Sequence, residues 1–202
     1  GANSGRSGTD PVWPSLGSPA LAHLDKIFVE PMPAIFRELR QNIRELPRAQ
    51  ALQLAVSNES KALSLYCVRL DEDGKIDPGL RQKGKGFLKQ MCSLSNESLL
   101  HVDAPLDRLS VQAVTLRELL EKHVTSPLRY VQVDVQGFDD LVVSQIPLDC
   151  LDWRPAGIVY EWSMIGRRWE ALNQKLRSYG YNVCQHADNM VAMLDESPGT
   201  AA

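Results

Sequence analysis

The chain has 202 residues, of which 44% are hydrophobic and 23% charged, with a formal net charge of −3 at pH 7. This length suits a single domain with a sizeable core, here residues 1–202, and the weak charge gives no reason to expect a nucleic-acid or membrane partner held electrostatically. No apolar run approaches the roughly 20 residues that a membrane-spanning helix needs, and no leader sequence is visible. We therefore expect a soluble, cytoplasmic protein.

The first half of the chain predicts alternating strands and helices. Residues 1–20 are rich in Gly, Pro and Ser, which predicts a loop with at most one short helical turn. The apolar run KIFVE at 26–30 predicts a buried strand. Two prolines end it and lead into AIFRELRQNIREL, whose apolar residues recur at helical spacing over 34–46. Segments 49–57 and 62–70 predict two further strands.

The pattern breaks down between residues 71 and 109. The segment DEDGKIDPGLRQKGKG is polar and glycine-rich, and the residues after it are only weakly periodic. Such a variable insertion in a domain is often a lid or a substrate wall. A surface excursion without a role is an equally good interpretation.

The second half continues the alternation. Thr115 caps a predicted helix through LRELLEKH, and later segments predict a strand at 129–135, a helix from about Asp139, a strand at 156–162, a helix at 167–180 and a closing hairpin before a tail at 195–202. Alternation of this kind predicts an α/β fold with a mostly parallel sheet covered on both faces. The hairpin would add an antiparallel C-terminal edge strand.

The four cysteines are scattered, without a CxxC pair or clustered histidines; they are Cys67, Cys92, Cys150 and Cys184. This spacing suggests neither a zinc site nor a disulfide framework. We expect reduced, partly buried thiols in a cytosolic protein.

Three acidic residues come at the ends of predicted strands: Glu30, Asp134 and Glu161. In a doubly wound sheet the ligand lies beyond the carboxyl ends of the strands, so the three carboxylates indicate a site. Glu30 suits the two hydroxyls of a ribose, although an acid at the start of the following helix is an equal alternative. Asp134 has a helix cap as its alternative. Asp134 and Glu161 offer oxygen ligands for Mg²⁺, but hydrogen-bonded carboxylates are commoner, and we expect no metal.

The segments GANSG, FVEPMPAIFRELRQN, LQLAVSNES, VTLRELLEKH and YVQVDVQGFDDLVV, in this order, resemble the FkbM-type methyltransferases. The resemblance covers the chain from Gly1 to about Leu194. It implies a Rossmann-like class I methyltransferase fold that binds S-adenosylmethionine.

The resemblance also implies roles for individual residues. Gly1, Asn3 and Gly5 match the loop at the methionine end of the cofactor, and Glu30 with Pro31 matches the motif that holds the ribose. Ala55, Val56 and Ser57 match the segment beside the adenine. Asp134 matches the family's acid near the acceptor, so Asp134, Glu161 or His186 would serve as the base.

Two features depart from the family pattern. The family usually has Glu where this chain has Gln136, and the first strand, which should precede GANSG, is not among the 202 residues. Either this strand lies upstream of Gly1, or the protein is diverged and fills the gap in another way. We expect an S-adenosylmethionine-dependent O-methyltransferase that acts on a hydroxyl of a small molecule, sugar or lipid. The alternative is a non-catalytic or diverged S-adenosylmethionine-binding protein of the same fold. An NAD-type dehydrogenase fits less well, because GANSGRSG lacks the G-x-G-x-x-G spacing.

Overall fold

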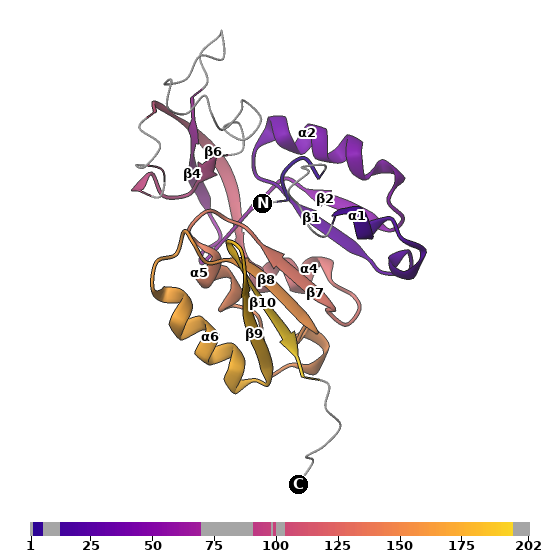
Figure 1. Cartoon of the computed structure of the whole chain (residues 1–202). Helices are drawn as coiled ribbons and strands as arrows, with labels where there is room; N and C mark the ends of the chain where they lie inside the picture. The colour runs from indigo at the N-terminus through magenta and orange to yellow at the C-terminus, as the bar shows by residue number, and fades with distance from the viewer. Residues whose placement is uncertain (1, 6–12, 70–90, 98, 100–103, 196–202) are drawn as a thin grey trace. The chain divides into compact units, whose positions relative to one another are not determined.

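The computed structural model describes residues 2–5, 13–69, 91–97, 99 and 104–195. The fold is mixed α/β (Figure 1), and the chain divides into two compact units, Gly1–Val114 and Thr115–Ala202. The predicted single domain stays a prediction. The roles expected for the insertion and for the tail also stay predictions, because residues 70–90, 98, 100–103 and 196–202 lie outside the described part of the chain.

The first unit begins with short helical turns and a parallel strand pair. The elements are α1 (Trp13–Leu16), η1 (Pro19–Leu21), β1 (Lys26–Val29), α2 (Pro33–Asn42), η2 (Ile43–Glu45) and β2 (Ala49–Leu52), and β1 pairs with β2 in parallel. Proline at the first turn of α2 costs no hydrogen bond there. The α-helix ends at Asn42 rather than at residue 46, because the chain tightens into η2.

A second sheet in this unit contains β3 (Ala55–Ser57), β4 (Ala62–Val68), β5 (Cys92–Ser93) and β6 (Leu106–Thr115), in the order β3-β6-β4-β5. The single strand predicted over 49–57 is wrong: it is divided into β2 and β3, which belong to different sheets. The prediction that the irregular segment extends to residue 109 is also wrong, because β6 already begins at Leu106 and runs antiparallel to β4.

Two strands of this second sheet are joined by a disulfide between Cys67 and Cys92, which are direct cross-strand partners in β4 and β5. The expectation of four reduced thiols is therefore wrong. Adjacent antiparallel strands bring residues that are far apart in sequence within bonding reach, and the spacing of cysteines along the chain does not reveal this. Cys150 and Cys184 are free, and they are exposed rather than partly buried.

The second unit holds a four-stranded sheet in the order β7-β8-β10-β9. Its elements are α4 (Leu116–His123), β7 (Tyr130–Val133), α5 (Asp139–Val143), η5 (Leu151–Trp153), β8 (Gly157–Glu161), α6 (Arg168–Ser178), β9 (Tyr181–His186) and β10 (Asn189–Leu194). Strands β7 and β8 are parallel, and β10 is antiparallel to both of its neighbours. The predicted closing hairpin is confirmed, whereas a mostly parallel Rossmann-like sheet stays a prediction.

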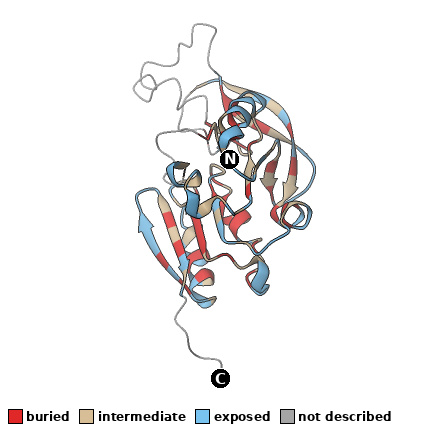
Figure 2. Ribbon diagram, turned by 90° about the vertical axis from the view of Figure 1, so that its right-hand side faces the viewer, coloured by how far each residue is buried: buried red, intermediate tan, exposed pale blue. Residues whose placement is uncertain are grey.

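The core of the second unit is built on β8. Ile158 and Tyr160 are completely buried, and the Tyr160 hydroxyl donates to the Asn173 side chain on α6. Figure 2 shows buried residues gathered on the strands, with exposed residues on the outer sides of helices. Thr115 begins α4 with a reciprocal capping box to Glu118, as its position in the sequence predicts. Within the described ranges, no helix has the length and apolar character to cross a bilayer.

Candidate functional site

The GANSG segment forms an ordered turn against the end of β1. The Ala2 amide donates to the Val29 carbonyl at 2.7 Å, and the Asn3 amide donates to Glu30 Oε2 at 3.0 Å. The Asn42 side chain donates to the Ser4 carbonyl at 2.7 Å, which ties the turn to the end of α2. The turn predicted from small residues is therefore held in place over residues 2–5. Gly1 itself lies outside the described residues.

Gly5 is required by the shape of this turn. Its φ is +73°, and a Cβ atom placed on it would lie 2.5 Å from the Trp13 ring and 3.0 Å from Leu39. A side chain would be strained by the left-handed backbone and would also overlap the indole. Asn3 also has a positive φ, of 54°, which asparagine tolerates better than most residues.

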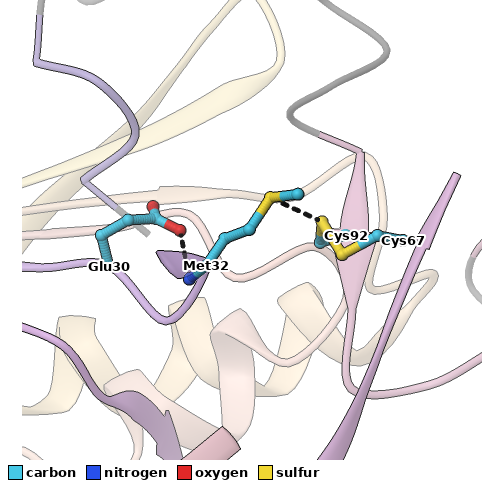
Figure 3. The surroundings of a disulfide bond; sticks show 4 residues. All are labelled: Glu30, Met32, Cys67 and Cys92. Atoms are coloured by element: carbon cyan, nitrogen blue, oxygen red, sulfur yellow. Dashed lines mark hydrogen bonds between the residues drawn. A yellow bond between two sulfur atoms is a disulfide. The ribbon is translucent and has the colours of Figure 1, made fainter. Parts of the chain in front are cut away.

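Glu30 is buried and connects the turn to the helix that follows. Its Oε2 accepts from Asn3, and its Oε1 accepts from the Met32 amide at 2.9 Å (Figure 3). Met32 is the N-cap residue of α2, so the proposed alternative of an acid at a helix start is present in the geometry. Each carboxylate oxygen keeps a second lone pair, so the ribose role is compatible with the same arrangement.

The predicted adenine segment lies in the same unit as Glu30. Ala55 is buried in a cluster with Leu65 and Cys67, and Met32 packs against this cluster. Figure 3 shows the Met32 thioether directed at the disulfide, with 3.6 Å between Met32 Sδ and Cys92 Sγ. Met32 therefore links the segment containing Glu30 and Pro31 to the sheet that carries Ala55, Val56 and Ser57. Ser57 is buried and Val56 half-buried.

Asp134 and Glu161 lie together in the second unit. Glu161 ends β8 and Asp134 directly follows β7, and these parallel neighbours bring their carboxyl ends to one edge of the sheet. The Gln136 amide nitrogen donates to Asp134 Oδ1 at 2.8 Å and to Glu161 Oε2 at 3.1 Å. The predicted convergence of these two acids is thus present, and Gln136, noted only as a departure from the family, bridges them.

Glu161 is electrostatically unusual. Burial raises its pKa to about 7, with further increases from the charges of Asp134, Asp139 and Asp188, while a hydrogen bond from Ser163 opposes the shift. A carboxylate with a pKa near neutral pH is a much better proton acceptor than an ordinary one.

The sequence analysis missed the residue that organises this edge. Asp139, which the sequence indicates only as the start of a helix, is completely buried and accepts hydrogen bonds from the amides of Val135, Gly137 and Glu161. Burial, followed by the charge of Asp134, raises its pKa to about 6. The sequence signal for this role of Asp139 is the pattern D-V-Q-G-F-D at residues 134–139. The turn between the two acids allows the second acid, Asp139, to accept hydrogen bonds from the amides of the loop.

Arg168 is a second residue that the sequence analysis missed. Its Nη2 donates to the Gly137 carbonyl at 2.9 Å, and its Nη1 lies 3.1 Å from Asp140 Oδ1. It therefore connects the start of α6 to the loop between β7 and α5.

Other predicted participants lie elsewhere or remain predictions. His186, the third candidate base, is exposed at the end of β9. Glu30 belongs to the first unit and Asp134 to the second, so a common site for them stays a prediction. Among the residues that the structure describes, no group of three or more His, Cys, Asp or Glu is placed to hold a metal ion.

Comparison with known proteins identifies the family. The family model described as the methyltransferase FkbM domain matches residues 1–183 of the 202 in the chain. No curated protein and no solved structure gives a significant match. The matched region includes the turn, Glu30 and the edge with Asp134 and Glu161. The chain therefore belongs to the FkbM methyltransferase family.

Proposed function

We propose that this protein is an S-adenosylmethionine-dependent O-methyltransferase with a Rossmann-like fold, which acts on a hydroxyl of a small molecule, sugar or lipid. The observation that carries the proposal is the family match over residues 1–183, which includes every residue assigned to cofactor binding or to catalysis. The parallel pairs β1/β2 and β7/β8 support a Rossmann-like sheet.

The residues of the first unit fit the cofactor. The Glu30 carboxylate has two backbone donors and, with about four lone-pair sites, can accept two vicinal hydroxyls as well. Asn3 and Gly5 would face the methionine end, together with Gly1, and Pro31 would hold Glu30 in position. Ala55, Val56 and Ser57 would flank the adenine.

The residues of the second unit supply the proton chemistry. S-adenosylmethionine, when bound, supplies an electrophilic methyl group on a sulfonium. Glu161 would take the proton of the acceptor hydroxyl, since its pKa of about 7 suits a general base at neutral pH. Asp134 would hold the acceptor and, through its negative charge, keep the Glu161 pKa high.

Calorimetric titration of the purified protein tests the cofactor. We expect S-adenosylmethionine to bind and NAD not to bind. Glu30→Ala should weaken binding by at least tenfold, while Glu45→Ala, which removes an exposed acid of the same unit, should leave the affinity unchanged. Equal affinity in the wild type and Glu30→Ala would contradict the ribose assignment.

Methyl transfer to a panel of hydroxyl compounds tests the reaction. Asp134→Asn and Glu161→Gln should lower turnover far more than cofactor affinity. A proportional loss of both would indicate that the two acids form a scaffold.

A second function is favoured by Gln136. A neutral amide lies between the two carboxylates where the family usually has an acid, and this supports a non-catalytic S-adenosylmethionine-binding protein. Cofactor binding without methyl transfer to any acceptor, together with no gain on restoring the acid by Gln136→Glu, would favour this alternative.

The cytoplasmic location stays a prediction, and one observation counts against it. Disulfides are rare in proteins of the reducing cytosol, and Cys67 and Cys92 form one.

A further inference from the structure

The loop that carries Asp134 and Gln136 has an unusual backbone. Gln136 has a φ of 51° and Gly137 a φ of 97°, so two successive residues are left-handed. For a residue with a side chain, this conformation persists only where the surroundings hold it. At this loop the amides on either side of Gln136, those of Val135 and Gly137, both donate to Asp139 Oδ2, at 3.4 and 3.3 Å.

The other oxygen of the same carboxylate reaches the neighbouring strand. Asp139 Oδ1 accepts from the Glu161 amide at 3.2 Å, at the end of β8. One buried side chain thus connects the loop after β7 with the end of β8. These are the two places that carry the acids bridged by Gln136.

We propose that Asp139 is the positioning residue of the proposed acid pair, and that its three amide contacts hold the loop and the strand end so that the Gln136 side chain bridges Asp134 and Glu161. This inference rests on the proposed function for the roles of the two acids. The dependence of the Gln136 bridge on Asp139 is a purely geometric claim, and it does not rest on the proposed function.

The test uses the titration of Glu161, followed by carboxyl carbon NMR and assigned with Glu161→Gln. Gln136→Ala removes a donor to the Glu161 carboxylate, so it should raise the midpoint by about half a pH unit, because hydrogen bonds to the charged form favour it. In an Asp139→Asn background the same substitution should change the midpoint by less than half as much. The comparison is a double-mutant cycle, which is needed because loss of the Asp139 charge by itself shifts Glu161.

The matched control is Asp140→Asn. Asp140 is the next residue of α5, is also buried and also negative, but its partner is Arg168 rather than the strand-end amides. In this background Gln136→Ala should keep its full effect on the Glu161 midpoint. An equal effect of Gln136→Ala in the Asp139→Asn and wild-type backgrounds would overturn the proposal.

A second measurement needs no substitution and therefore stays available if Asp139→Asn does not fold. In the wild-type protein, the amide protons of Val135 and Gly137 should shift with the midpoint of the Asp139 carboxyl carbon. The Glu161 amide proton should show that same midpoint in addition to the midpoint of its own side chain. Absence of the Asp139 midpoint from any of the three amides would overturn the proposal. Failure of the proposed function would appear independently, as an absence of S-adenosylmethionine binding with the NMR results unchanged.

Discussion

The disulfide between Cys67 and Cys92 gives a quantitative prediction for the first unit. The two cysteines are 25 residues apart. In the chain-entropy account, closing a loop of this length stabilises the folded state by about 3.5 kcal/mol. With a urea dependence of roughly 2 kcal/mol per molar, loss of the bond should lower the unfolding midpoint by about 1.5 to 2 M.

The assay is urea unfolding of the wild type, with and without reductant, and of the Cys67→Ala/Cys92→Ala variant. Peptide-resolved hydrogen exchange should locate the loss in β4 and β5, the two strands that the bond joins. The control is Cys150→Ala/Cys184→Ala, which removes the free, exposed thiols and should leave the midpoint unchanged. Equal midpoints with and without reductant, or alkylation of all four cysteines in the unreduced unfolded protein, would refute the reasoning.

Three further predictions concern single residues. Gly5→Ala should destabilise the protein by about 2 kcal/mol or more, because alanine is strained in the left-handed conformation and its Cβ would overlap the Trp13 indole. The loss would be measured as a lower melting temperature, and an unchanged melting temperature would contradict the described turn. Thr115→Ala removes the side chain that caps α4 and should lower the free energy of unfolding in urea by about 1 kcal/mol, whereas Thr115→Ser keeps the hydroxyl and should lower it much less. Because the Asp139 pKa is raised to about 6, the folded chain holds a proton that the unfolded chain has lost, so the free energy of unfolding should fall by about 2 kcal/mol from pH 4 to pH 6. Asp139→Asn should remove this contribution, and an equally steep decline in that variant would contradict the assignment.

Sequence patterns predicted the acids at strand ends well in the second unit. Apolar runs that end in a carboxylate predict the places of Glu161 and Asp134, and parallel pairing of β7 and β8 brings them to one edge. The pattern could not reveal that Gln136 joins them, because its side-chain direction depends on a left-handed backbone. Nor could it show that Asp139 points inward, since an acid in the first turn of a helix is usually exposed to solvent.

The strand β6 shows a different kind of failure. Its residues Leu109, Val111 and Ala113 alternate with polar neighbours, and such alternation is a strand signal. The signal was overlooked because it directly follows an irregular segment. The break between β2 and β3 has a weaker signal, because only Gln53 and Leu54 separate the two strands and Gln50 is just as polar as Gln53.

Most of the helices and strands of this protein could be predicted from the sequence alone. Their signals are apolar periodicity, prolines, the capping threonine and the closing hairpin. Each of these acts over a few residues, so it can be recognised without knowledge of the fold. Partners distant in the chain were decided only by the folded structure. The Cys67–Cys92 bond, the amides gathered by Asp139 and the contact of Glu30 with the N-terminal turn each join separate segments. Such contacts depend on strand register and burial, which arise only when the segments pack together.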